Sequence, residues 1–188
     1  RNTWSWGAGV DDWGAPKAVS KPLLAAVPAP SGAQWAVRAD DETLGAYFLY
    51  GRQQAEPLYT ENESNAERLW NHPNATPYVK DAFHRYVVNG ELAAVNPART
   101  GTRFAAWHVL TAAAGETVSI ELTLVRGELQ APFDQEEEVF VQREAEATIF
   151  YEDLQPHCSR EDARILRQSL AGMIWSKQFF HFDVARWQ

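Results

Sequence analysis

The sequence has 188 residues, of which 45% are hydrophobic and 12% aromatic, so its length and apolar content are those of one folded domain and not of a disordered chain. Its formal net charge of −8 argues against a nucleic-acid partner, because an acidic surface repels phosphate backbones. The sequence contains no run of about 18 apolar residues, so no membrane-spanning helix is predicted. The single cysteine excludes an internal disulfide framework and indicates a reducing, cytoplasmic compartment.

The first half of the chain shows the patterns of loops and strands. Trp4 and Trp6 alternate like one face of a strand, and the glycines and prolines that follow predict loops and extended chain to residue 31. Strands are predicted from Gln34 onward. Trp35 and Val37 share one side of the first strand, and a polar connection leads to a second strand over residues 46–50.

Two further strands are predicted after residue 100. The segment 103–110 carries apolar residues at both parities, which predicts a strand covered on both faces. The segment 117–125 alternates strictly, and its apolar side is expected to face the core, namely Val118, Ile120, Leu122 and Leu124. The glycine-containing link 112–116 predicts a hairpin loop between these two strands.

A long insertion, residues 59–96, separates the two groups of strands. Thr76 and Pro77 predict the N-cap and first residue of a short helix, and Asn89-Gly90 predicts its end. Ordered insertions of this length often carry function. The insertion is therefore the first place to look for a site.

The pattern becomes helical after Phe133. Three glutamates, Glu136–Glu138, suit the first turn of a helix that Pro156 ends. Ser159 with Asp162 three residues later predicts the start of a second helix. Strands followed by helices indicate an α+β fold or two abutting domains. The aromatic-rich closing residues, 179–188, predict contact with a further domain.

The residues alone leave the chemistry open. Metalloprotease, P-loop, CxxC and nucleophile-elbow motifs are absent, and the five histidines lack metal-ligand spacing, so no metal or cofactor is expected. Glycoside cleavage needs two carboxyl groups, and Glu61, Glu63, Glu67 and Asp81 lie in the insertion. Sequence does not supply their separations, and charged residues in a polar loop are usually solvated.

Three stretches resemble a known enzyme family. They are Arg1–Gly7 (RNTWSWG), the insertion's TENESN at 60–65 with Arg68-Leu69, PYVKDAFH at 77–84 and YVV at 86–88, and LAGMIWSKQF at 170–179. Together they resemble bacterial glucosidase-like proteins related to mannosylglycerate hydrolase and to glycoside hydrolase family 63, the processing mannosyl-oligosaccharide glucosidases. The resemblance covers nearly the whole chain.

The resemblance implies an inverting α-glycosidase that uses an acid–base carboxylate pair and no metal. It implies a β-sandwich domain, of which residues 1–132 are the later part, a linker helix at 133–156, and the start of a catalytic (α/α)6 barrel at 157–188. The acid and base of that barrel match no position in this chain, so no catalytic residue is assigned. The expected partners are a small saccharide or glycoside and the remainder of the same polypeptide.

Six residues of the opening loop and the insertion are candidates for the rim of the sugar site, because they can stack on or hydrogen-bond to a saccharide: Trp4, Trp6, Asn62, Asn65, Asp81 and His84. Any single Trp is more often a core residue, and Asp81 with His84 is more often a plain polar contact than a catalytic dyad. The alternatives are a non-catalytic carbohydrate-binding or structural β-sandwich domain, and a hydrolase complete within 188 residues.

Overall fold

The computed structural model describes residues 9–10, 16–17, 21–154 and 157–177. The chain divides into two compact units, Arg1–Asp134 and Gln135–Gln188. The first unit holds antiparallel sheets with short helices and the second holds two long helices, so the fold is mixed α+β as the sequence predicts. None of the described helices is long and apolar enough to cross a bilayer.

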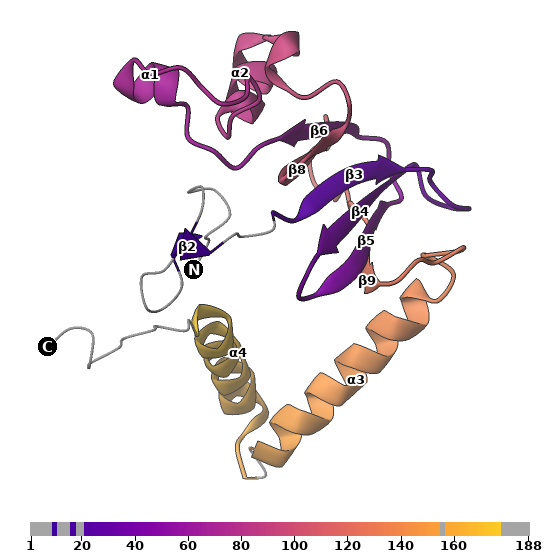
Figure 1. The fold of residues 1–188 in the computed structure, drawn as a ribbon. Coiled ribbons are helices and arrows are strands. Elements are labelled where there is room, and N and C mark those ends of the chain that lie inside the picture. Colours follow the sequence, from indigo (N-terminus) through magenta and orange to yellow (C-terminus); the bar gives the residue numbers. More distant parts are fainter. Residues whose placement is uncertain (1–8, 11–15, 18–20, 155–156, 178–188) are drawn as a thin grey trace, which may run out of the picture. The chain divides into compact units, whose positions relative to one another are not determined.

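A five-stranded sheet forms the body of the first unit (Figure 1). Its strand order is β7-β3-β4-β5-β9 and every neighbouring pair is antiparallel. The bounds of its strands are Thr100–Gly101 for β7, Leu23–Val27 for β3, Trp35–Asp41 for β4, Gly45–Gly51 for β5 and Leu122–Arg126 for β9. A separate two-residue pair joins β1, Gly9–Val10, to β2, Pro16–Lys17.

A second, two-stranded sheet pairs β6, Glu56–Thr60, with β8, Arg103–Trp107. One face of β4 meets this sheet in an apolar cluster that contains Trp35, Val37 and Tyr59, with Phe104 packed against it. Trp35 and Val37 therefore share a buried side, as predicted. We call the two sheets together the two-sheet body.

The strand β8 is covered on both faces, as its sequence predicts. Phe104 contacts the Tyr59 ring on one side, at 5.2 Å between ring centroids. On the other side Trp107 meets Tyr86 edge to face at 5.9 Å, and the Arg103 guanidinium lies 5.3 Å from the Phe83 ring centroid. The predicted strand ends early, however, because residues 108–110 are not in a strand.

For the last strand, the prediction of which side chains face the core is wrong. β9 covers 122–126 and not 117–125. The register places Val125 opposite Phe48, and both belong to the cluster around Tyr50 and Phe133. This cluster forms because the chain after Gly127 returns across that face, where the Leu129 amide donates to the Tyr50 hydroxyl at 2.8 Å. The residues expected to face the core are instead exposed, with Val118 at 44%, Ile120 at 40%, Leu122 at 52% and Leu124 at 68%.

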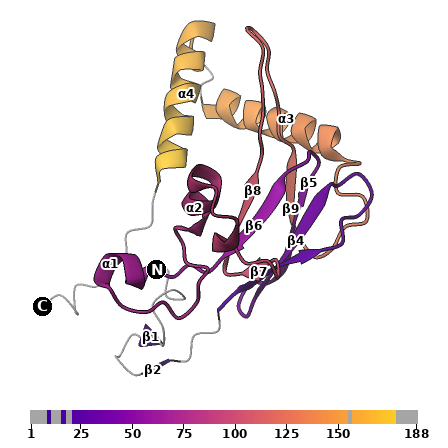
Figure 2. The same ribbon diagram turned by 90° about the horizontal axis from the view of Figure 1, so that it is seen from above.

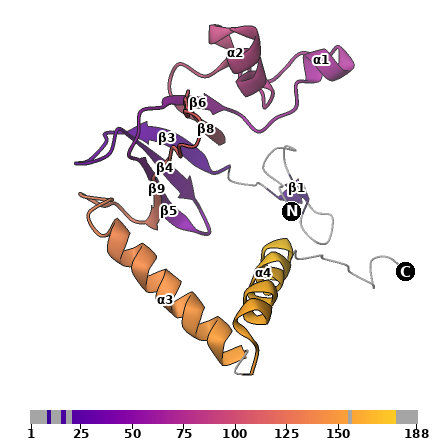
Figure 3. The same ribbon diagram turned by 180° about the vertical axis from the view of Figure 1, so that it is seen from behind.

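The insertion contains α1, Ala66–Trp70, α2, Ala82–Asn89, and a short 3-10 helix over Leu92–Ala94. Its two ends meet where the Asn96 amide donates to the Tyr59 carbonyl at 2.9 Å. Figures 1 and 3 show α1 and α2 together beyond β6, on the side of the two-sheet body away from β9.

The helix α2 begins five residues later than predicted. Thr76 accepts from the Tyr78 amide through its hydroxyl instead of capping a helix. The next residues are held in extended form, because the Glu61 amide donates to the Tyr78 carbonyl at 2.7 Å and the Lys80 amide to the Glu63 carbonyl at 2.8 Å. The predicted end is confirmed, since Gly90 caps α2 with a left-handed backbone at φ 72°.

The second unit has the two predicted helices, α3 over Glu136–Leu154 and α4 over Arg160–Ser176. The predicted start of α4 is confirmed. Ser159 accepts from the Asp162 amide at 3.2 Å and donates to its carboxylate at 2.6 Å, so Asp stands in for the Glu of a capping box. Arg167 links the helices by its 5.0 Å contact with the Tyr151 ring.

Gly51 is required by the packing of Trp35 across the β4–β5 pair. A Cβ at Gly51 would lie 2.0 Å from the indole Cε2. We expect Gly51→Ala to lower the free energy of unfolding of the two-sheet body by about 1–3 kcal/mol in urea denaturation, because the methyl group must displace the indole. The control is Gly172→Ala in α4, where an added Cβ meets nothing within 4 Å. Equal stability of the two variants would contradict this account.

Tyr59 makes stability sensitive to alkaline pH. Its side chain is 1% exposed, its hydroxyl has no hydrogen-bond partner in the described part of the chain, and burial raises its pKa to about 12. The folded chain thus keeps a proton that the unfolded chain loses near pH 10, so the free energy of unfolding falls as pH rises from about 10 to about 12. Tyr59→Phe should reduce this fall in alkaline denaturation curves. It should also be neutral or stabilising by up to about 1 kcal/mol at pH 7, and a clear loss of stability would reveal a partner for the hydroxyl.

Candidate functional site

An open polar pocket of about 670 Å³ lies in the insertion, between α1 and the start of α2. This volume is in the range that holds a small organic ligand. Most of its lining residues carry amide, guanidinium, imidazole or carboxylate groups, and two are prolines: Asn65, Glu67, Arg68, Asn71, His72, Pro73, Asn74, Pro77 and Arg85.

Asn65 organises the wall of the pocket. Its side-chain oxygen, Oδ1, caps α1 by accepting a hydrogen bond from the backbone amide of Arg68 at 3.1 Å. The same oxygen accepts from the Asn74 side chain at 3.0 Å. Its amide nitrogen lies 3.1 and 3.3 Å from the two carboxylate oxygens of Asp81. One side chain thus joins the start of α1, the loop at 74 and the start of α2.

Asn74 completes this network. Its side-chain oxygen accepts from the Ala66 amide at 2.7 Å and from the Glu67 amide at 3.3 Å. These amides belong to the first turn of α1, where backbone donors have no partner inside the helix. Asn65 and Asn74 therefore hold a helix of five residues that is too short to be stable by itself.

Asp81 is the N-cap residue of α2 but makes no capping hydrogen bond. Its carboxylate instead receives the Asn65 amide and lies 3.5 Å from the Arg68 guanidinium. Asp is a favoured N-cap residue, so its carboxylate is used here for contacts across the pocket wall in place of the usual cap. The Arg68 side chain remains 69% exposed, so its other donors face the open side.

Two residues at the pocket have distinct roles. Arg85 is held by Glu91, at 2.7 Å from Nη2 and 2.8 Å from Nε to the carboxylate, and this contact holds the pKa of Glu91 below its usual value. Asn71 ends α1 in a left-handed conformation at φ 53° and is exposed, and its side chain makes no hydrogen bond to any described residue. Arg85 is thus fixed, whereas the Asn71 amide is available to a ligand.

The structure brings together two of the six predicted rim residues. Asn65 and Asp81 are hydrogen-bonded, and Asn65 lines the pocket. Asn62 does not line it, and its backbone amide donates to the Thr102 hydroxyl at 2.8 Å. His84 is exposed, does not line the pocket, and makes no hydrogen bond or ion pair with Asp81 or any other described residue. Trp4 and Trp6 lie outside the described residues.

Sequence reasoning missed Arg68, Asn71 and Asn74 as pocket residues. The segment 61–74 contains a signal, because it holds four asparagines, at 62, 65, 71 and 74, and asparagine tolerates left-handed and capping positions. None of the described His, Cys, Asp and Glu residues form a group of three that could hold a metal ion. The pocket wall offers hydrogen-bond donors from asparagine amides and arginine guanidinium groups. Beside it, the Asp81 carboxylate contacts Asn65 and Arg68.

The chain is 35% identical over 143 residues to the uncharacterized protein YMR196W of Saccharomyces cerevisiae. The match covers 69% of this chain and 13% of the yeast protein, so the chain spans a small part of that relative's length. No family model matches the chain, and no solved structure matches it.

Because Asn65 contacts Asp81, a second carboxylate at position 65 should lower the free energy of unfolding by an amount that depends on pH. We expect Asn65→Asp to lower the free energy of unfolding by about 1–2 kcal/mol at pH 7, because two partly buried carboxylates then lie side by side. One of them must take up a proton in the folded state, so its folded pKa is raised and the cost should shrink as the pH is lowered toward 4. Urea denaturation across this pH range measures the effect.

The matched comparison is Asn65→Ser, which keeps a capping oxygen but adds no charge. Its loss of stability should not depend on pH beyond the dependence of the unsubstituted chain. If the two variants follow the same pH profile, Asp81 does not face residue 65 in solution.

Proposed function

We propose that this chain is an internal segment of an inverting, glucosidase-like α-glycosidase, and that its polar pocket binds part of a saccharide substrate. In this proposal the two-sheet body is the later part of a β-sandwich domain, α3 is the linker helix, and α4 is the first helix of an (α/α)6 catalytic barrel. The carboxylic acid and base that cleave the glycosidic bond belong to other parts of the polypeptide. The parent enzyme works in the cytoplasm.

The observation that carries the proposal is the composition of the pocket. A sugar presents hydroxyl groups that both donate and accept hydrogen bonds, and an asparagine amide offers both functions in one plane. Three asparagines line the pocket together with Arg68, and Pro73 and Pro77 supply apolar surface for the C–H groups of a ring. Trp70, which does not line the pocket, is 65% exposed beside it in the sequence and could stack on a saccharide that extends beyond the pocket.

The fixed geometry of the wall also favours binding. Asn65 and Asn74 are held by several hydrogen bonds each, so their side chains lose little freedom when a ligand arrives. Exposed side chains such as Asn71 and Arg68 then supply the contacts that a saccharide completes. The division between fixed and available groups is that of a pre-formed ligand site.

Saccharide binding is tested by titrating the isotopically labelled chain with methyl α-glucoside and following its NMR spectrum. We expect shifts of the pocket amide signals at millimolar ligand. Asn71→Gly, which keeps the left-handed backbone but removes the amide side chain, should weaken binding by roughly 2- to 10-fold, because one hydrogen bond to a ligand contributes about 0.5–1.5 kcal/mol.

The matched control is Gln130→Ala, which removes an exposed side-chain amide outside the pocket and should leave binding unchanged. The glycosidase part is tested in the longer parent polypeptide, where replacing Asn65 or Asp81 should raise KM or lower kcat on α-glucosides. Saccharide binding without turnover by the parent would favour a carbohydrate-binding domain. Unchanged kinetics for all six rim candidates would discard a role at the sugar site.

A further inference from the structure

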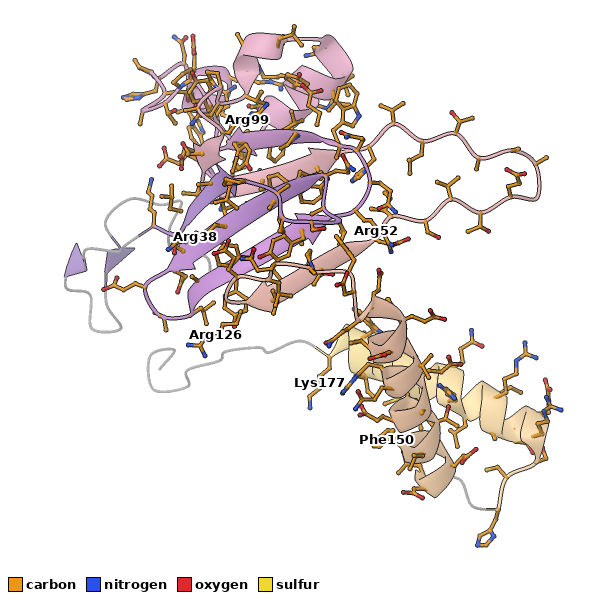
Figure 4. All side chains as sticks on the ribbon, turned by 90° about the vertical axis from the view of Figure 1, so that its right-hand side faces the viewer. Arg38, Arg52, Arg99, Arg126, Phe150 and Lys177 are labelled. Carbon is orange, nitrogen blue, oxygen red and sulfur yellow. The ribbon has the colours of Figure 1, made fainter. Side chains whose placement is uncertain are left out.

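The connection between β8 and β9, residues 108–121, is a long loop that extends from the two-sheet body. We call it the arm, and its legs are the chain segments before and after its tip. Figure 2 shows the legs running away from the strands, and Figure 4 shows the same arm on the side of Arg52. At its tip the Glu116 amide donates to the Ala113 carbonyl at 3.0 Å, and Gly115 adopts φ 80°. The predicted turn is therefore present, but the legs it joins are not strands.

The second leg of the arm, residues 117–121, continues the line of β9 past the end of its partner. β5 ends at Gly51, which pairs with Leu122. At the base, the Arg52 amide still donates to the Glu121 carbonyl at 3.2 Å. For residues 117–120 no backbone hydrogen bond occurs to any part of the chain that the structure describes. The backbone of this leg is therefore unpaired within the described part of the chain.

The side chains of this leg nevertheless follow the pattern of a half-buried strand. Val118 and Ile120 alternate with Thr117 and Ser119, and the apolar side continues into β9. Leu124 lies opposite Leu49 in the sheet, so this side is the face on which the two-stranded sheet packs. Over β9 and the arm, the described residues of the first unit leave that face exposed.

We infer that the second leg of the arm and the exposed face of β9 receive an extended strand from elsewhere in the same polypeptide, outside these 188 residues. The incoming strand would pair with the free backbone of residues 117–120 and place alternating apolar side chains against Ile120 and Leu124. This is strand addition at an open edge. The inference rests on the part of the proposed function that makes this chain a segment of a longer protein.

Two observations favour the same polypeptide over a second copy. The yeast relative is much longer than the matched region, which is 13% of it, so a related protein carries ample further chain. Each copy of this chain has a net charge of −8, and the tip of the arm carries Glu116. Two copies meeting at their arms would bring like charges together.

Hydrogen exchange of the 188-residue chain and of the longer parent polypeptide tests this directly. The amides of residues 117–120 should exchange near the rate of an unstructured peptide in the chain alone, and at least 100-fold more slowly in the parent. Ile120→Asp should abolish that slowing in the parent, whereas Ser119→Asp on the opposite side should keep it. In the chain alone both variants should still unfold in a cooperative thermal transition, because residues 119 and 120 lie on exposed chain outside the sheets.

The remaining outcomes overturn the inference. Slow exchange in the chain alone that depends on its concentration, with a dimer in light scattering, would make a second copy the occupant. Fast exchange of these amides in the parent, or slow exchange in a monomeric chain alone, would show that no added strand is needed. None of these measurements uses a saccharide, so the strand-addition inference and the saccharide-binding proposal are tested independently.

Discussion

The burial of Trp35 between the two sheets is the interaction on which the rest of the first unit depends. Its indole lies over Gly51, donates through Nε1 to the Gln53 carbonyl at 3.1 Å, and contacts the Phe104 ring at 5.5 Å between centroids. These contacts tie β4 to the chain that leaves β5 and to β8. Since β6 and β8 bracket the insertion, the same contacts position both of its ends.

The pocket is stabilised by side-chain hydrogen bonds and not by a core. The helix α1 has no buried residue, and its first turn depends on two asparagines. A second anchor holds the base of the insertion, where Tyr86 donates to Glu56 on β6 and this contact raises the pKa of Tyr86. A rigid sheet with a polar, hydrogen-bonded insertion is the usual way to carry a binding surface on a stable scaffold.

Local signals predicted the elements whose ends are set by nearby residues. The Ser159 cap, the Gly90 stop and the Trp35–Val37 alternation depend on contacts a few residues away or on a simple period, and all three are present. The predictions are wrong where residues far away in the sequence determine the local structure. Alternation in 117–125 showed two faces, but the return of Phe133 decided which face is covered. Likewise residues 61–63 hold 78–80 extended and delay α2, which no propensity at Thr76 reveals.

Exposed apolar surface occurs in both units and has the same physical meaning in each. On α3, Phe140 is 69% and Ile149 is 60% exposed, between charged residues of the same helix. On α4, Met173 is 69% and Ile174 is 59% exposed. Leaving such side chains in water forgoes about 25 cal/mol per Å² of apolar surface. Partners for these helices would recover that free energy, which supports the proposal that this chain works as part of a larger protein.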